Sequence, residues 1–239
     1  MFRNTNSDLN KKSRLLGELG DLSHSTVSSS EFKYRKGTEI FGEGEPAEYI
    51  YQLVEGAVRT YKLLSDGRRQ IGAFHLPGDI FGLANEPLQR FTAEAIIKST
   101  VRVVKRESLA RQAKSDPAIA RTLIKMTTDN LQHVENHLLL LGRKSASERV
   151  AAFLLEMNVR MTSNSLALPM TRRDIADYLG LTLETVSRAL HAYEQKGYLK
   201  TGGPMFRDIT VLDPAGLSES DPFNSLLHPK ADDLLTGSP

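Results

Sequence analysis

The chain has 239 residues, 40% of them hydrophobic and 25% charged, with a formal net charge of +2 and no cysteine. The lack of cysteine excludes disulfide bonds, thiolate zinc sites and cysteine-held iron–sulfur clusters. The small net charge argues against a general polyanion binder. Any DNA-binding surface would therefore have to come from local clusters of lysine and arginine. No apolar run reaches the roughly 18 residues of a membrane span, and the N-terminus lacks the apolar core of a signal peptide, so we expect a cytoplasmic protein without a membrane partner.

The N-terminal part of the chain changes from polar to strand-rich. Residues 1–29 are polar and end in a serine-rich run, which predicts a flexible leader. Residues 30–116 contain short strand-like runs that are separated by glycine at regular intervals. Ser65-Asp66-Gly67 has the composition of a hairpin turn. A spacing of about 8–12 residues per strand predicts an antiparallel barrel or sandwich.

A long helix is predicted for residues 117–142, after the break at Ser115-Asp116-Pro117, where proline suits a first helical turn. Its apolar or small residues recur at alternating steps of three and four: Ile124, Thr127, Leu131, Val134, Leu138 and Leu141. This seam can pack on its own domain or on a second copy. The run Leu138–Leu141 is more apolar than one intramolecular face needs, which favours a homodimer with these six residues at the interface.

Two short helices are predicted around the turn Leu179-Gly180-Leu181. They follow an amphipathic helix within 143–169, and a loop at 162–170. Thr171 and Asp174 have the spacing of a capping box, and Thr182 can cap the second helix. The residues expected to point inward are Ile175, Ala176, Leu179, Val186, Ala189, Leu190 and Tyr193. The pattern indicates a helix-turn-helix.

The outer face of the second helix carries Leu183, Glu184, Ser187, Arg188 and His191. A carboxylate, a guanidinium and a hydroxyl in an exposed first turn are typical of a helix that reads base edges in the DNA major groove. The alternative is a helical hairpin whose charges are only solvated. After Gly197 we expect a two-stranded wing with Gly202-Gly203-Pro204 at its tip, so residues 143–217 form a winged helix-turn-helix domain, and residues 218–239 a weakly ordered tail.

These elements, in this order, resemble the family of the cAMP receptor protein and the fumarate-nitrate reduction regulator (CRP/FNR) over residues 30–217. PGDIFG at 77–82 is similar to the family's barrel turn, and LTLETVSRAL at 181–190 to the recognition helix of its oxygen-related branch. Without cysteine, the chain is most similar to FixK-like regulators. The resemblance implies an α+β fold: an N-terminal antiparallel β-roll of the cyclic-nucleotide-binding type, a long dimerisation helix, and a C-terminal winged helix-turn-helix.

The resemblance also implies a function. We expect a transcription regulator, mainly an activator, that binds a TTGA…TCAA-like palindrome in double-stranded DNA as a homodimer and controls low-oxygen respiration or nitrogen-fixation genes. Glu184, Ser187 and Arg188 match the branch's base-reading positions, with Leu183 beside them. Arginine can donate two parallel hydrogen bonds to guanine, and a glutamate can accept one from cytosine. The phosphate-contact candidates are Arg172, Arg173, Thr182, Thr185, Lys200 and Arg207. Simple solubility is the alternative role for Arg172, Arg173 and Lys200.

The predicted barrel departs from its nucleotide-responsive relatives. These have a glycine-glutamate pair for the ribose and an arginine-serine pair for the phosphate, where this chain has Gly82-Leu83 and Phe91-Thr92. Arg90 stands one position early, which on a strand would aim it at the opposite face. We therefore expect no cyclic nucleotide and no cofactor. The alternative is an effector-gated sensor of the same fold, for which a slipped strand would have to restore Arg90.

Three histidines and one loop complete the candidates. We expect His75 to be a hydrogen-bonded structural residue rather than a haem ligand, and His133 and His137 to form a polar stripe near the dimer axis rather than a metal site. By family analogy, the loop that would contact RNA polymerase comprises Ser65, Asp66, Gly67, Arg68 and Arg69.

The chain has none of the common hydrolase or phosphate-binding motifs, so we expect no enzyme. An interaction protein, whose helix-turn-helix serves only for packing, is the other alternative.

Overall fold

The computed structural model describes residues 29–84, 86–143, 145–161, 165–202 and 208–219. By its internal contacts the chain divides into two units, residues 1–134 and 135–239, which are described separately. Helix α2 (Pro117–Arg143) begins in the first unit and ends in the second. None of the helices in the described ranges is long and apolar enough to cross a membrane.

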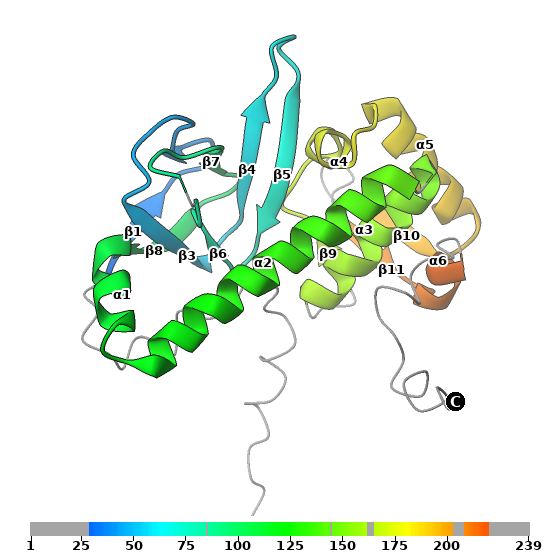
Figure 1. Ribbon diagram of the computed structural model, residues 1–239. Coiled ribbons are helices and arrows are strands. Elements are labelled where there is room, and N and C mark those ends of the chain that lie inside the picture. Colours follow the sequence, from blue (N-terminus) through cyan, green and yellow to red (C-terminus); the bar gives the residue numbers. More distant parts are fainter. Residues whose placement is uncertain (1–28, 85, 144, 162–164, 203–207, 220–239) are drawn as a thin grey trace, which may run out of the picture. The chain divides into compact units, whose positions relative to one another are not determined.

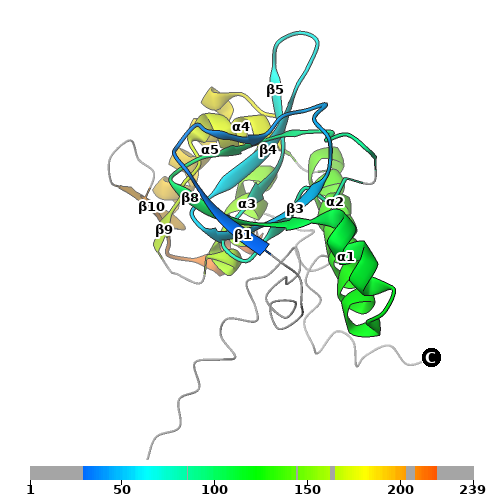
Figure 2. The same cartoon turned by 90° about the vertical axis from the view of Figure 1, so that its left-hand side faces the viewer.

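The first unit is built on two four-stranded antiparallel sheets (Figure 1). One sheet has the order β1 (Ser29–Tyr34), β8 (Ser99–Lys105), β3 (Tyr49–Glu55), β6 (Ile80–Phe81). The other has the order β2 (Glu39–Phe41), β7 (Thr92–Ala95), β4 (Val58–Leu63), β5 (Arg69–His75). The predicted turn closes the β4–β5 hairpin, where Gly67 has a φ of 81° and Leu64 N–H donates to the Arg68 carbonyl at 2.8 Å. In Figures 1 and 2 this hairpin projects beyond the other strands of the roll.

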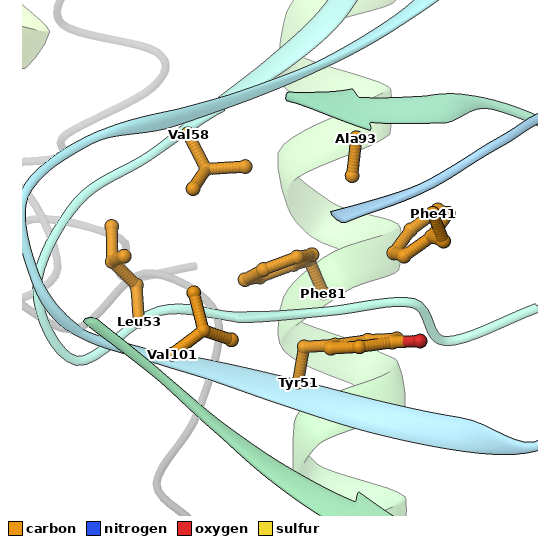
Figure 3. Packing of buried hydrophobic residues seen from close by; sticks show 7 residues of the cluster. All are labelled: Phe41, Tyr51, Leu53, Val58, Phe81, Ala93 and Val101. Carbon is orange, nitrogen blue, oxygen red and sulfur yellow. The ribbon is translucent and has the colours of Figure 1, made fainter. Parts of the chain in front are cut away.

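The interior of the roll is filled by its own side chains (Figure 3). Both sheets contribute to this cluster, which consists of Phe41, Tyr51, Leu53, Val58, Phe81, Ala93 and Val101. The ring centroids of Phe41 and Tyr51 lie 4.9 Å apart, and those of Tyr51 and Phe81 lie 5.3 Å apart. Alternation along the strands places these side chains inward because successive residues of a strand point to opposite faces. We call this cluster the roll interior.

A second cluster joins the roll to its helices. Its buried members are Ile50, Ile80, Val104, Leu109, Ile119 and Met126, which come from strands β3, β6 and β8 and from helices α1 (Arg106–Ala113) and α2. Pro117 starts α2 as predicted, and the Asp116 carboxylate accepts a hydrogen bond from Ala118 N–H at 2.8 Å. Figure 2 shows α1 beside the start of α2. We call this cluster the helix-base core.

The second unit has helices packed with a small sheet. The elements are α3 (Ala146–Arg160), β9 (Ser165–Ala167), α4 (Arg172–Leu179), α5 (Leu183–Gln195), β10 (Leu199–Gly202), β11 (Asp208–Val211) and α6 (Pro214–Glu219). The predicted inner side of α3 is buried at Val150, Phe153, Leu154 and Met157. The two units together have the expected α+β architecture of sheets, long helix and helix-turn-helix.

The two strands predicted for the wing are present as the antiparallel pair β10–β11, but the sheet has a third strand that the sequence did not predict. The described strands of the small sheet have the order β10-β11-β9, and β9 lies in the segment that we expected to be a loop. Three residues are too few for alternation to be visible in a sequence, and the strand forms because β11 offers its second edge for pairing. Helix α6 also continues to Glu219, past the expected start of the tail. The leader (1–28), the wing tip (203–207) and residues 220–239 lie outside the described residues.

The close packing of the turn between β3 and β4 can be tested by glycine substitutions. Gly56 has a φ of 97°, and a Cβ there would lie 2.7 Å from Ser99 Cα and 2.5 Å from the Lys98 carbonyl oxygen, whereas Gly37, with a φ of 75°, has open space. Gly37→Ala should lower the free energy of unfolding by about 1 kcal/mol through backbone strain alone. Gly56→Ala should lower it by a further ~1–3 kcal/mol through the clash. Urea denaturation measures both, and equal losses would contradict this packing.

Candidate nucleic-acid interface

Both ends of α4 and the start of α5 are set by local features that the sequence predicts. The Thr171 hydroxyl accepts from Asp174 N–H at 3.1 Å, and the Asp174 carboxylate accepts from Thr171 N–H at 2.9 Å, which completes the capping box. Gly180 ends α4 in the left-handed region with a φ of 62°, a conformation that costs glycine little. Thr182 caps α5 by accepting from Thr185 N–H at 3.2 Å. The two helix termini therefore fix where α5 begins.

The inner face of α5 is buried as expected. Val186, Ala189, Leu190 and Tyr193 are all buried, and Leu179 of α4 is fully buried. Two hydrogen bonds add to this packing, one between α5 and α3 and one between α3 and α4. The Tyr193 hydroxyl donates to the Ser147 carbonyl at 2.8 Å, and the Arg149 guanidinium donates to the Leu179 carbonyl at 3.1 Å. Rotation of α5 about its axis would break the Tyr193–Ser147 hydrogen bond and expose its buried side chains.

The outer face of α5 presents the predicted base-reading residues. Glu184 and Arg188 are exposed, and Leu183 and Ser187 are half-buried. Hydrogen bonds, first from its own backbone N–H and then from the Thr182 hydroxyl, hold the pKa of Glu184 below its ordinary value. The positive charges of Arg173 and Arg188 act in the same direction. Glu184 is therefore ionised at neutral pH and is an acceptor only, as the contact to a cytosine amino group requires.

The phosphate-contact candidates are less uniform. Arg173 on α4 and Lys200 on β10 are exposed, whereas Arg172 is half-buried. The hydroxyls of Thr182 and Thr185 lie 3.0 Å apart and take part in capping α5. Arg207 lies outside the described residues. Among those of the six that the structure describes, Arg173 and Lys200 are the exposed cations, as a phosphate contact needs.

A contact that no sequence pattern predicts ties α5 to the wing. The Glu194 carboxylate accepts hydrogen bonds from Thr201 N–H at 2.9 Å and from the Thr201 hydroxyl at 2.8 Å. These two bonds hold the pKa of Glu194 below its ordinary value. The pair has no local signature because its residues belong to a helix and a strand, and only the pairing of β10 brings them together. The contact fixes Lys200, the neighbour of Thr201, relative to α5.

The long helix α2 has two apolar faces. The buried face recurs every seven residues at Ile119, Met126, His133 and Leu140. The predicted seam lies on another face. Ile124 is 66% exposed, Leu131 56%, Val134 54% and Leu138 68%. Thr127 is exposed and Leu141 half-buried. We call these six residues the exposed stripe, because its four large apolar side chains Ile124, Leu131, Val134 and Leu138 are each more than half exposed.

The expectation that His133 and His137 form a polar stripe near the dimer axis is wrong. His133 is 8% exposed and lies on the buried face of α2. His137 stacks on Tyr178 of α4 with ring centroids 4.2 Å apart. The two histidines lie on the side of α2 that faces its own chain. The sequence pattern alone does not distinguish this side from the exposed stripe. In the described part of the chain, no group of three histidine, aspartate or glutamate side chains could hold a metal ion.

Comparison with known proteins assigns these features to one family. Residues 148–220 match the Crp-like helix-turn-helix domain, and residues 31–116 match the cyclic nucleotide-binding domain. The chain is 44% identical over 194 residues to the nitrogen fixation regulation protein FixK of Azorhizobium caulinodans, which covers 79% of this chain and 77% of that protein. The chain belongs to the CRP/FNR family of transcription regulators.

Two further relatives place the chain within this family. The transcriptional activatory protein AadR of Rhodopseudomonas palustris is 37% identical over 215 residues, 87% of this chain and 85% of that protein. The structure of FixK2 from Bradyrhizobium japonicum is 58% identical, with a TM-score of 0.78 over 82% of this chain and 98% of that chain. The protein is a DNA-binding transcription regulator of the FixK/FNR type rather than an enzyme, which confirms the predicted family, fold and role.

The structure places the residues of the roll that the sequence singled out. Leu83 packs against the helix-base core, and Arg90 is exposed. A Cβ on Gly72 would lie 3.2 Å from the Phe91 ring, so this ring lies over the backbone of β5. His75 is buried, stacks on Phe81 at 4.9 Å, and its Nε2 lies 3.2 Å from the Thr60 hydroxyl. His75 is thus a hydrogen-bonded side chain of the roll, as expected.

The tie between α5 and the wing gives a pH-dependent prediction. Because the folded pKa of Glu194 lies below its unfolded value, its carboxylate stabilises the fold at neutral pH, and this stabilisation disappears as the pH falls through the folded pKa. Glu194→Gln should therefore lower the free energy of unfolding at pH 7 by less than about 1 kcal/mol. The difference from the wild type should shrink at an acidic pH, below the folded pKa, where the carboxyl is protonated.

Chemical denaturation at the two pH values measures this difference. Thr201→Val is the matched control, because it removes the hydroxyl donor and keeps the backbone N–H that also binds Glu194. It should cost less than Glu194→Gln at pH 7. A deficit of Glu194→Gln that is equally large at both pH values would show that the carboxylate charge does not matter.

Proposed function

We propose that two copies of this chain bind a palindromic double-stranded DNA site of the TTGA…TCAA kind, without a small-molecule effector, and that each copy reads one half-site with α5. The observation that carries this proposal is the outer face of α5. There an ionised Glu184 lies near Arg188, on a helix whose inner face is fully buried. Arg188 would donate to O6 and N7 of a guanine, Glu184 would accept from a cytosine amino group, and Ser187, with Leu183, would contact neighbouring bases.

Binding affinity would come from contacts with the DNA backbone. Arg173 and Lys200 are the exposed cations beside α5 and on the wing. Arg172, Thr182, Thr185 and Arg207 complete the proposed set. Such contacts release counterions, so the logarithm of the binding constant should fall steeply with the logarithm of the salt concentration. They fix the position of the protein on the duplex and carry no sequence information themselves.

The exposed stripe of α2 supports the homodimer. A row of apolar side chains with exposures between 54% and 68% is unfavourable in water. Heptad spacing matches this row to a second copy of itself, because a two-fold axis brings identical faces together. Pairing of two α2 helices would place the two recognition helices about one DNA turn apart, roughly 34 Å. The palindrome follows from this symmetry.

The packed roll interior supports effector independence. Phe41, Tyr51 and Phe81 fill the space between the two sheets, and the positions of the nucleotide-responsive pairs carry Leu83 and Phe91. An anion held in the roll would need a charged donor, because an unpaired buried phosphate is costly. The family match to cyclic nucleotide-binding domains keeps an effector-gated sensor as the alternative. Tight binding of the ligand-free protein to the palindrome would exclude it.

We also assign a partner beyond DNA and a regulatory role. The exposed residues Ser65–Arg68, with the half-buried Arg69, form the tip of the β4–β5 hairpin, where Arg68 pairs with Asp66 at 2.7 Å. We assign contact with RNA polymerase to this tip. The FixK relatives are named for regulation of nitrogen fixation, and we assign control of nitrogen-fixation or low-oxygen respiration genes to this chain. Such a regulator acts in the cytoplasm, where bacterial DNA lies.

Arg188→Ala tests base reading. It should weaken binding to the palindrome by about 1–3 kcal/mol for each bidentate pair of hydrogen bonds to guanine that it removes, and leave binding to unrelated DNA nearly unchanged. Arg173→Ala is the matched control, because it removes an arginine from the same surface. It should weaken binding to all sequences and reduce the salt slope by about 1 per subunit, or about 2 for the dimer. Fluorescence anisotropy at several salt concentrations measures both. Equal effects of Arg188→Ala on specific and unrelated DNA would overturn the assignment.

Leu131→Asp and Leu138→Asp test the exposed stripe. Each places a charge in an apolar interface, so the protein should become monomeric and lose affinity for the palindrome. The monomer itself should stay folded, since both side chains are exposed in it. Gln132→Asp introduces the same charge at an exposed position on another face of α2 and should leave the dimer intact. Sedimentation velocity measures the oligomeric state of each variant. If the Leu131→Asp protein remained a dimer, another surface would have to pair the subunits.

A further inference from the structure

Arg106 joins three segments of the first unit. It is the first residue of α1, and its backbone N–H donates to the Glu48 carbonyl at 2.9 Å, just before β3. Its guanidinium donates to two carbonyls of the segment after β6, with Nη2 3.0 Å from the Gly82 oxygen and Nη1 bonded to Ala84. A planar fork with two parallel donors suits two neighbouring carbonyls, which a lysine cannot bind in the same way.

The segment that Arg106 binds connects the two cores of the unit. Ile80 belongs to the helix-base core, and the next residue, Phe81, belongs to the roll interior. Leu83 packs against the helix-base core, which includes Ile119 and Met126 of α2. A displacement of Phe81 in the roll interior would therefore be passed along the backbone to side chains that contact the start of α2. Residues 80–84 therefore connect the roll interior to the side chains that pack on α2.

Arg106 occupies an electrostatically poor position. A cation in the first turn of a helix faces the positive end of the helix dipole. Burial of the guanidinium lowers the pKa of Arg106 from its ordinary value. Helix α1 gains nothing from a guanidinium at this position, since an acidic or small polar residue would suit its first turn better. The Arg106 side chain therefore contributes through its hydrogen bonds to residues 82 and 84.

We propose that Arg106 takes the place of an effector: by tying residues 82–84 to the first turn of α1, it holds the base of α2 in the arrangement that binds DNA without a ligand. This inference rests on the proposed effector independence. Arg106 is a positioning residue, which acts on DNA through α2 and touches no nucleotide. Loss of its guanidinium frees the link at residues 80–84, so the DNA-competent arrangement becomes a minor population and the apparent affinity falls by the same factor.

The test uses the full-length chain and the palindrome, at a temperature at which circular dichroism shows each variant to be folded. Arg106→Ala should bind DNA about tenfold more weakly than the wild type, as expected for losing hydrogen bonds from a charged donor. Methylguanidinium chloride, which has the shape of the missing group, should restore affinity to Arg106→Ala. The same concentration of sodium chloride should not, and neither salt should raise the affinity of the wild type.

Arg102→Ala is the matched control. Arg102 is an arginine of β8, four residues earlier, whose guanidinium contacts Glu31 and Gln52 and not residues 82–84. Its loss should lower the melting temperature of the roll and leave DNA affinity at the wild-type level. An equal loss of affinity in both variants, or no response of Arg106→Ala to methylguanidinium, would reduce Arg106 to a general stabilising residue and overturn the proposal.

Two further outcomes are decisive. Wild-type affinity in folded Arg106→Ala protein overturns the proposal directly. If Arg106→Ala does not fold, Arg106→Lys decides, since it keeps the charge and the aliphatic stem and loses the fork: reduced affinity supports the proposal and wild-type affinity overturns it. Failure of the wild type to bind DNA without ligand would instead refute effector independence, and this inference with it.

Discussion

Helix α5 presents a polar outer face only because its opposite side is completely packed. The side chains of Val186, Leu190 and Tyr193 are buried, and the Tyr193 hydroxyl reaches the Ser147 carbonyl on α3. A helix of 13 residues is only marginally stable on its own in water, so its position comes from this packing. The accuracy with which Arg188 can meet a base edge is therefore set by apolar residues that never touch DNA.

The same principle extends to α2, which divides its apolar residues between two faces. One face, with Ile119 and Met126, holds the helix to the roll through the helix-base core. The other, with Leu131 and Leu138, is exposed in a single chain. If a second copy binds at this exposed face, as we propose, the helix that it contacts is the one whose first turns pack on the roll. In this proposal Arg106 acts where residues 80–84 join the two cores.

Sequence reasoning succeeded where the physics is local and failed where it is not. Capping residues act over only a few positions, so Thr171 predicted the start of α4, Gly180 its end, and Thr182 the start of α5. Strand β9 was missed because three residues carry no period and pair only with a strand more than forty positions away. The Glu194–Thr201 and Arg106–Gly82 contacts depend on tertiary structure in the same way. His133 and His137 were misplaced because a seven-residue repeat on α2 fits the buried face as well as the exposed one.

The most direct measurement of the central claim is in vitro selection of DNA from a random pool by the purified, ligand-free protein. The account predicts an inverted repeat with its two half-sites about one helical turn apart, and an invariant guanine–cytosine pair in each half that corresponds to Arg188 and Glu184. Enrichment of a single, unrepeated half-site, or of no common sequence until a small molecule is added, would contradict it.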